Sequence, residues 1–178
     1  FAKNGINVIA IDKNKNIVDK LKRGEVPFFE PLLQDQIVAS KDYITYQTTQ
    51  EGLEHTDITI ILVNTPTDTV HGTFSNAQII SAIEEICDTL RKANKNTHNF
   101  ILSSTVMPGS INEYFIPLIE KRLGWTVNTD FSFAYVPDFV ALGSVIRDFE
   151  MPNFCVIGQS NDKFGSYVEG LYSKTFKN

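Results

Sequence analysis

The stretch ITIILVNTPTD (residues 58–68) is an apolar strand that ends abruptly in a loop containing hydroxyl groups and a proline. The stretch FILSSTVMPGS (residues 100–110) repeats this construction, and helix-capping residues follow both strands. In an open α/β sheet, loops at the carboxyl ends of parallel strands converge where the N-termini of helices also point. We therefore expect the functional residues of this chain in these two loops.

The rest of the sequence continues the same alternation of strands and helices. Hydrophobic periodicity predicts further strands over residues 7–12, 43–46, 131–135 and 154–158. It predicts helices over residues 17–24, 32–39, 75–90, 110–124 and 162–172, with a brief helical segment at 50–53. Ser75 and Ser110 each begin a capping-box pattern, and Pro117 should bend its helix. This regularity predicts an α/β fold with a doubly wound, mainly parallel sheet and right-handed crossovers.

Composition excludes several classes of function. The chain has 178 residues, 42% of them hydrophobic, which is enough for one domain or most of a larger one. Its net charge is -5 and its 16 Lys and Arg residues are scattered, which argues against a nucleic-acid partner. The longest apolar run is about six residues, far below the roughly 20 needed to cross a bilayer. We expect a cytoplasmic protein with no membrane partner.

The cysteines and histidines show no metal-ligand or disulfide spacing. Cys87 falls on the apolar face of a predicted helix and Cys155 in a predicted hydrophobic strand, so both are expected in the core. His55, His71 and His98 are expected at the surface. The sequence therefore predicts no metal site.

Asp12 ends the first predicted strand, where dinucleotide-binding folds place an acid that accepts hydrogen bonds from the adenosine ribose. An equally weighted alternative is that Asp12 only caps the helix at Lys13. The first interpretation requires a strand and a glycine-rich turn about 20 residues upstream, and neither is present in the sequence. Because residues 1–5 resemble the last turn of a helix closed by Gly5, we expect the chain to be truncated there.

Several motifs, in this order along the chain, resemble the N-terminal domain of the nucleotide-sugar 6-dehydrogenases. They are the segment 4–12, the Glu30-Pro31 turn, Val63-Asn64-Thr65-Pro66-Thr67, Ser104-Thr105-Val106-Met107-Pro108-Gly109-Ser110, and Val136-Pro137-Asp138-Phe139 with Arg147-Asp148, Pro152 and Gly158. This family includes UDP-glucose, GDP-mannose and UDP-N-acetylmannosamine dehydrogenases. The resemblance implies that residues 1–178 form a partial, Rossmann-like NAD-binding domain without its first strand, glycine-rich turn, central helix and C-terminal sugar-binding domain.

The resemblance also implies a reaction and roles for individual residues. The reaction is an NAD-dependent, four-electron oxidation of the sugar C6 hydroxyl to a carboxylate through an enzyme-bound thioester. Thr65 and Pro66 match positions along the cofactor, and Thr105 matches a threonine near the nicotinamide that also orients the catalytic water. Asp138 matches an acid, usually Glu, linked to that water. By the same resemblance, the full-length protein is expected to act on a nucleotide sugar in polysaccharide biosynthesis, as a homodimer.

The sequence departs from the family at two positions and leaves other functions open. Leu142 stands where many members have a second acid, and Ile17 where a basic residue often follows the ribose acid. The family's thiol nucleophile lies outside this chain, and the chain alone is expected to be inactive. One alternative is another NAD-linked dehydrogenase, of the hydroxyacid or 6-phosphogluconate type. A second is a nucleotide-binding module without catalysis, in which Thr65, Thr105 and Asp138 are only turn residues.

Overall fold

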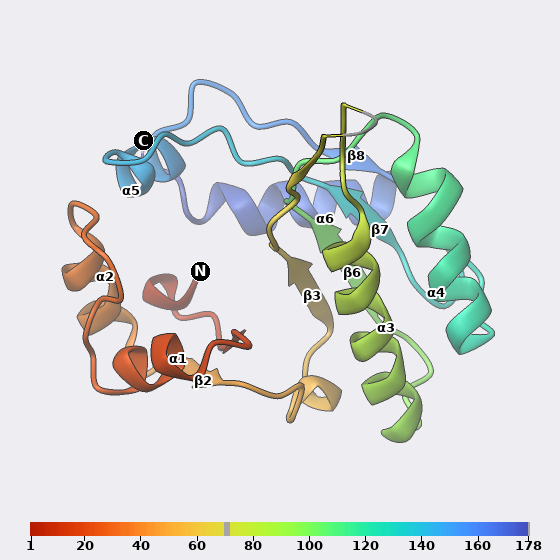
Figure 1. The fold of residues 1–178 in the computed structure, drawn as a ribbon, viewed down its shortest axis with the longest axis horizontal. Helices are drawn as coiled ribbons and strands as arrows, with labels where there is room; N and C mark the ends of the chain where they lie inside the picture. The colour runs from red at the N-terminus through yellow and green to blue at the C-terminus, as the bar shows by residue number, and fades with distance from the viewer. Residues whose placement is uncertain (70–71, 178) are drawn as a thin grey trace. The chain divides into compact units, whose positions relative to one another are not determined.

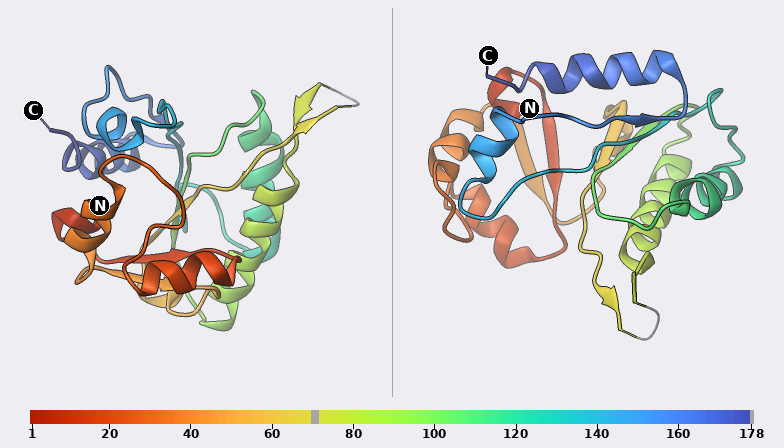
Figure 2. Two further views of the ribbon diagram at one scale, coloured as in Figure 1. Left: turned by 60° about the vertical axis from the view of Figure 1, so that its left-hand side comes forward. Right: turned by 90° about the horizontal axis from the view of Figure 1, so that it is seen from above.

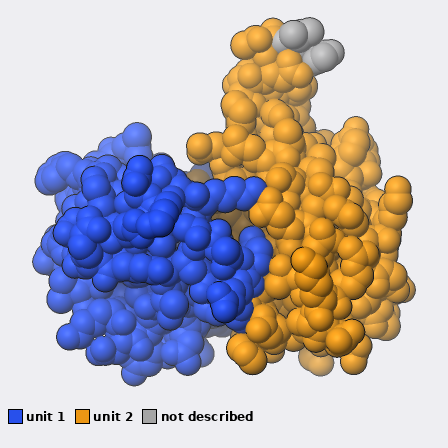
Figure 3. Space-filling model, turned by 60° about the horizontal axis from the view of Figure 1, so that its bottom comes forward, with its two compact units in different colours: residues 1–52, 139–155, 169–178 blue, residues 53–138, 156–168 orange. Residues whose placement is uncertain are grey.

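The structure is a computed structural model that describes residues 1–69 and 72–177 (Figure 1). The chain forms two compact units, coloured separately in Figure 3. Unit 1 comprises Phe1–Gly52, Phe139–Cys155 and Glu169–Asn178, and unit 2 comprises Leu53–Asp138 and Val156–Val168. The chain therefore passes between the units several times.

Unit 1 is built on two parallel strands, β1 (Val8–Ile11) and β2 (Ile44–Gln47), with Val8 opposite Ile44. Its helical elements are η1 (Ala2–Asn4), α1 (Lys15–Lys22), α2 (Leu33–Ser40) and α5 (Val145–Glu150), and it includes the end of α6 (Asp162–Ser173). Gly5 closes η1 with a φ of 80°, a left-handed conformation that glycine adopts without steric strain. The predicted helical turn before Gly5 and the strand after it are confirmed.

Unit 2 contains a four-stranded sheet in the order β3-β6-β7-β8. Strands β3 (Ile58–Ile61), β6 (Asn99–Leu102) and β7 (Phe133–Tyr135) are parallel, and β8 (Gly158–Gln159) is antiparallel to β7. Its helical elements are η2 (Leu53–His55), α3 (Ala77–Lys92), η3 (Ile111–Phe115), α4 (Ile116–Leu123) and the start of α6. A short hairpin of β4 (Thr67–Asp68) and β5 (Thr73–Phe74) extends from it (Figure 2). The predicted mainly parallel α/β fold is confirmed.

The core of unit 2 lies between α3, α4 and one face of the sheet. Its buried members are Leu53, Ile61, Ile79, Ile83, Ile86, Cys87, Leu90, Phe100, Leu102, Phe115, Ile119, Phe131 and Phe133. Ile101 and Ala134 are also buried, and they point to the opposite face because successive strand residues alternate in direction. Both faces of the central strands are thus covered, which explains why β6 is apolar at every position from Phe100 to Leu102.

The last predicted strand is wrong over most of its length. Residues 154–157 form no strand, and the antiparallel strand β8 begins only at Gly158. Phe154 is 58% exposed and packs against the ring of Phe139, with 4.8 Å between ring centroids. Cys155 is exposed and was wrongly predicted to be buried. An apolar run alone does not reveal whether a neighbouring strand is available to pair with it.

The two predicted capping boxes are also wrong in detail. Asn76 is the N-cap of α3, and its side chain makes no capping hydrogen bond, while the Ser75 hydroxyl accepts one from Ala77 at 3.3 Å. The helix after Ser110 begins as the π-helical turn η3, in which Ile116 donates to the carbonyl of Ile111. Pro117, which has no N–H to donate, follows at once in the first turn of α4. The predicted end of this helix at Gly124 is confirmed by a left-handed φ of 70°.

Two further predictions need correction, and one residue is not covered. His98 is buried at 1% exposure, contrary to the surface position expected, whereas His55 is exposed. His71 lies outside the described residues. The brief helical segment expected at 50–53 is the 3₁₀ turn Leu53–His55 instead. Among residues 1–69 and 72–177 no cluster of His, Cys, Asp and Glu forms a metal site, and no helix is long and apolar enough to span a membrane.

Candidate functional site

Three of the predicted site residues follow neighbouring strands of the unit 2 sheet. Thr65 follows β3, Thr105 follows β6 and Asp138 follows β7, each a few residues beyond the end of its strand. These strands are adjacent and parallel, so the three residues lie at the same edge of the sheet. In open α/β sheets this carboxyl edge is where ligands bind.

Solvent reaches the residues at this edge. Thr105, Asp138 and Pro66 are exposed, and Thr65 is half-buried. The strands before Thr105 and Asp138, in contrast, are buried, with Leu102 and Phe133 at 0% and 2% exposure. Exposed polar groups on buried supports suit a ligand site, because the supports hold them in place without covering them.

The Ser104 hydroxyl joins the loop after β3 to the loop after β6. The ladder between these strands continues past their ends, with Ser103 N–H donating to the Ile61 carbonyl at 2.9 Å. Beyond that bond, the backbone N–H of Val63 donates to Ser104 Oγ at 2.8 Å, and the same hydroxyl donates to the Val63 carbonyl at 2.8 Å. Ser104 is buried at 3% exposure, so the hydroxyl replaces backbone pairing where the two loops diverge.

The Asp138 carboxyl group has an altered proton affinity. Although the residue is exposed, neighbouring protein atoms remove part of its hydration, and this desolvation raises the pKa of Asp138 above its ordinary value. Desolvation is the cause of this raised pKa, with no opposing contribution from a nearby positive charge among the described residues. The carboxylate is therefore a better proton acceptor than an ordinary surface aspartate.

Asp12 belongs to unit 1, where it directly follows β1. Its side chain is exposed, and its Oδ1 accepts a hydrogen bond from Asn14 N–H at 2.7 Å. Asn14, rather than Asp12, is the N-cap of α1, because its side chain accepts from Asn16 N–H at 3.0 Å. The alternative in which Asp12 caps the helix at Lys13 is thus wrong, because α1 begins at Lys15 and its N-cap is Asn14.

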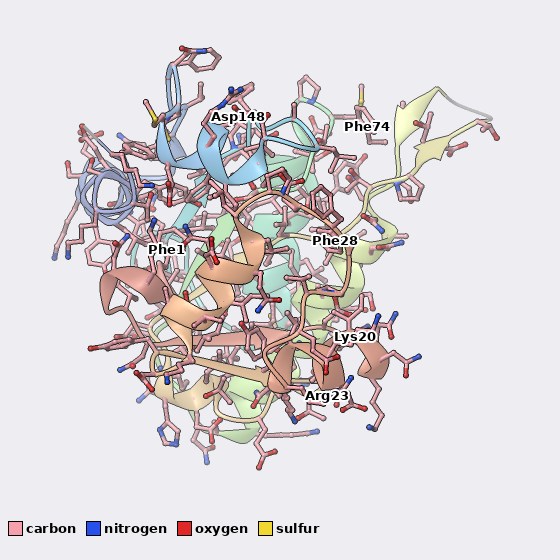
Figure 4. The ribbon with its side chains drawn as sticks, turned by 90° about the vertical axis from the view of Figure 1, so that its left-hand side faces the viewer. Phe1, Lys20, Arg23, Phe28, Phe74 and Asp148 are labelled. Atoms are coloured by element: carbon pink, nitrogen blue, oxygen red, sulfur yellow. The ribbon has the colours of Figure 1, made fainter. Side chains whose placement is uncertain are left out.

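A buried carboxylate in unit 1, that of Glu30, holds the segment 141–145. Glu30 is 7% exposed, and its two oxygens accept hydrogen bonds from the backbone N–H groups of Gly143 at 2.9 Å and Val145 at 3.0 Å. The same segment is held at its start by Asp148 of α5, labelled in Figure 4, whose carboxylate accepts a hydrogen bond from Ala141 N–H at 3.1 Å. Leu142, at the position where the resembled family often has an acid, is 94% exposed.

The two thiols differ strongly in environment. Cys87 is buried in α3, and burial raises the pKa of its thiol to about 12, so it stays protonated at neutral pH. Cys155 is exposed in the segment before β8. The core position predicted for Cys87 is confirmed, and its environment is that of an unreactive thiol.

The roles of Ser104, Glu30 and Asn76 in holding these segments were not predicted from the sequence. Ser104 had a detectable signal, since a serine directly after a buried strand and directly before a candidate threonine is well placed to bond to the next loop. Glu30 accepts hydrogen bonds from Gly143 and Val145, which lie 113 and 115 positions further along the chain. Hydrophobic periodicity carries no information on such distant pairs.

Comparisons with known proteins agree on one family. Residues 1–176 match the model of the UDP-glucose/GDP-mannose dehydrogenase family, NAD binding domain. The chain is 31% identical over 175 residues to GDP-mannose 6-dehydrogenase of Pseudomonas syringae pv. tomato, covering 96% of this chain and 39% of that protein. It is 27% identical over 164 residues to UDP-glucose 6-dehydrogenase AglM of Haloferax volcanii, covering 92% and 38%. The chain thus spans about two fifths of the length of these relatives.

Solved structures give the same result. The chain superposes on GDP-mannose dehydrogenase of Pseudomonas aeruginosa, determined as a ternary complex, with a TM-score of 0.90 and 27% identity, covering 97% of this chain and 40% of that one. The chain is also similar to the UDP-N-acetyl-mannosamine dehydrogenase Cap5O of Staphylococcus aureus, with a TM-score of 0.83, 25% identity, and coverage of 99% and 42%. With its Rossmann-like fold, the chain belongs to the UDP-glucose/GDP-mannose dehydrogenase family, in which it corresponds to the NAD-binding domain.

Proposed function

We propose that the protein containing this chain uses NAD to oxidise the C6 hydroxyl of a nucleotide sugar to a carboxylate, and that this chain is its cofactor-binding part. One observation carries the proposal: a match to the NAD-binding domain of the family extends over residues 1–176. The position of Thr65, Thr105 and Asp138 after three adjacent parallel strands supports it.

The residues of the chain fit the cofactor by their donor and acceptor groups. The Asp12 carboxylate has one oxygen committed to Asn14 N–H, which orients the group and leaves the other oxygen for the hydroxyls of the adenosine ribose. Its negative charge repels a 2'-phosphate and so favours NAD over the phosphorylated cofactor. Thr65 and Pro66 are assigned to positions along the bound cofactor, and Thr105 to a position beside the nicotinamide. When bound, NAD supplies the acceptor for hydride.

We assign Thr105 and Asp138 a joint catalytic role. A threonine hydroxyl and a carboxylate can hold one water molecule between them, and the carboxylate can accept a proton from it. The raised pKa of Asp138 favours this role, because a base whose pKa approaches the working pH binds the transferred proton more strongly. Asp138 must be deprotonated to act, so its activity is lost as the pH falls through its pKa.

The substrate and partners follow from the family and remain part of the proposal. The substrate is a UDP- or GDP-hexose, which fits relatives named for GDP-mannose and UDP-glucose. The family resemblance further leads us to propose a homodimer, a cytoplasmic location and a place in polysaccharide biosynthesis. No specific observation favours the alternatives of a hydroxyacid or 6-phosphogluconate dehydrogenase, or of a module without catalysis.

The test is an assay of NADH formation by the complete gene product with a panel of UDP and GDP sugars. The proposal predicts NADH formation with one or more of these sugars. We expect Thr105→Ala to lower kcat by about 10-fold to 100-fold and Asp138→Asn to lower it by about 100-fold or more, the range typical of lost acid–base groups. Absence of NADH with every sugar, although the protein is folded, would overturn the proposal.

A further inference from the structure

We propose that Ser104 is a positioning residue, whose buried hydroxyl sets the spacing between the loops that carry Thr65 and Thr105. This inference rests on the proposed function, since it concerns the geometry of the cofactor-binding loops. It assigns a role to a residue that touches neither the proposed cofactor nor the reacting atoms.

The first argument is the position of the hydroxyl in the chain. Thr105 directly follows Ser104, and Thr65 lies two residues after Val63. The hydroxyl bonds to both backbone polar groups of Val63, each at 2.8 Å. One side chain thus fixes the point from which each loop leaves the sheet, close to both threonines.

The second argument is that the protein uses both hydrogen-bonding functions of this hydroxyl. A serine hydroxyl has one proton to donate, and here the Val63 carbonyl takes it, while the Val63 N–H occupies one acceptor position. At 3% exposure, Ser104 has little access to water. Loss of the hydroxyl would therefore leave two backbone groups of Val63 without a partner at a mostly buried position.

A second connection joins the far ends of the same loops. Asn76 is the N-cap of α3, where asparagine usually caps its own helix. Its side-chain nitrogen instead donates to the Ser110 hydroxyl at 3.3 Å, and Ser110 is 3% exposed. Ser110 directly precedes η3, so this bond links the starts of two helices. The loop of residues 103–110 is thus attached to its neighbour near both ends, and Thr105 lies between the attachments.

The experiment compares Ser104→Ala, Ser104→Cys and Ser103→Ala in the complete gene product. Ser103 is the matched control, because it is the adjacent serine and is buried at 6% exposure, while its recorded bond uses only the backbone N–H. Ser104→Cys keeps the shape of the side chain and fills the position at least as fully, but it replaces the hydroxyl with a weak donor and acceptor. The readouts are hydrogen exchange of the Val63 amide, the dissociation constant of NAD, and kcat and KM for NADH formation.

The inference predicts a specific set of results. In Ser104→Ala, exchange at Val63 should accelerate about tenfold, because a buried hydrogen bond is lost. The NAD dissociation constant should rise and kcat should fall by about tenfold or more, since small displacements of positioning groups have large effects on rate. Ser104→Cys should resemble the alanine variant in all three measurements. In Ser103→Ala, the exchange rate at Val63, the NAD dissociation constant and kcat should stay within about twofold of the unmodified protein, because no side-chain hydrogen bond between the loops is lost.

Each other result is also decisive. If Ser104→Ala accelerates exchange at Val63 but leaves NAD binding and kcat unchanged, the inference is overturned while the proposed function stands. If Ser104→Cys behaves like the unmodified protein, the volume of the side chain matters rather than its hydrogen bonds, and the inference is likewise overturned. If the unmodified protein binds no NAD, the proposed function fails and this inference fails with it.

Discussion

The Glu30 carboxylate lies 3.0 Å from the backbone nitrogen of Val145, 115 residues further along the chain, and accepts its hydrogen bond. A second oxygen of the same carboxylate accepts from Gly143 at 2.9 Å. Glu30 is 7% exposed, so this pair of bonds to a charged group is largely shielded from water. A carboxylate that satisfies two backbone donors in this way fixes the segment before α5 to the segment before α2.

Replacing Glu30 with glutamine should release the segment 141–145. Glutamine has the same shape, but its NH₂ group would face one of the two backbone N–H donors, so one bond is lost and a donor is left without a partner. We expect a loss of about 1.5–3 kcal/mol in the free energy of unfolding, the range for hydrogen bonds to charged groups. Urea unfolding measures this loss, and amide exchange at Gly143 and Val145 locates it.

Glu25→Gln is the control for this substitution. Glu25 pairs with Arg23 at the surface, where both side chains are more than half exposed. Such pairs contribute little, so the change in unfolding free energy should be below about 1 kcal/mol. Equal effects of the two substitutions would contradict the role given to Glu30.

Unfolding stability should decline as the pH falls from about 6.5 to about 4 because of His98. Burial, aided by Lys95, lowers the pKa of His98 to about 4, against the smaller opposing effects of the Thr56 backbone and of Asp57. An unfolded chain takes up the proton near pH 6.5, while the folded protein resists it until about pH 4. The contribution of His98 is therefore complete above pH 6.5 and decreases below it, by at most about 3 kcal/mol.

The difference in unfolding free energy between the unmodified protein and His98→Leu, followed across pH, isolates the contribution of His98. Leucine cannot titrate, but it also removes the 2.8 Å hydrogen bond between His98 Nε2 and Thr59 Oγ1, with an expected loss of about 1 kcal/mol at neutral pH. The unmodified protein should be the more stable of the two at neutral pH, and because only it loses free energy as the pH falls, it should become the less stable one before pH 4. His55→Leu, at an exposed position, is the control and should change the unfolding free energy at neutral pH by less than about 0.5 kcal/mol. A difference for His98→Leu that stays constant with pH would refute the explanation.

The two cysteines should react with a thiol reagent at very different rates. Cys155 is exposed, whereas Cys87 is buried with the pKa of its thiol raised to about 12. Because the thiolate is the reactive form, we expect Cys155 to be labelled rapidly in the folded protein and Cys87 only on unfolding. Mass spectrometry of labelled Cys155→Ser and Cys87→Ser variants assigns each rate. Rapid labelling of Cys87 in the folded protein would show that α3 opens more readily than its packing indicates.

The pH dependence of kcat should reveal the raised pKa of Asp138. If Asp138 acts as the base, the rate falls on the acidic side as its carboxylate takes up a proton. Desolvation moves this fall to higher pH than the ordinary pKa of aspartate, about 3.9. Steady-state rates of NADH formation across the acidic range test this directly. An acidic limb that is unchanged in Asp138→Asn would assign the proton transfer to another group.

The fold was largely predictable from local pattern. Strand 99–102 is buried on both faces from Phe100 to Leu102, and such a strand appears in sequence as a short apolar run closed by loop residues. The predictions failed where the structure of a segment depends on contacts with residues far away in the sequence. Residues 154–157 are as apolar as a strand but have no strand partner, and His98 is buried because Thr59 offers its ring a hydrogen-bonding partner.

The position of the candidate residues in the fold was predictable for a similar reason and to a similar limit. Thr65, Thr105 and Asp138 each lie a few residues after a strand, and because these strands are adjacent and parallel, the residues lie at one edge of the sheet. The groups that hold these loops were not predictable, because they are contacts between segments far apart in sequence. The bond of Ser104 to Val63 spans 41 residues and that of Asn76 to Ser110 spans 34. Spacing rules for helices and strands do not extend to such pairs.

The central claim is that the sheet edge after β3, β6 and β7 holds the nicotinamide half of NAD. A crystal structure of the complete gene product with bound NAD tests it most directly. We expect the nicotinamide ring to lie beside the Thr105 side chain, with Thr65 along the cofactor and Asp138 within reach of a water held by Thr105. A cofactor bound without contact to Thr65 or Thr105 would contradict the account.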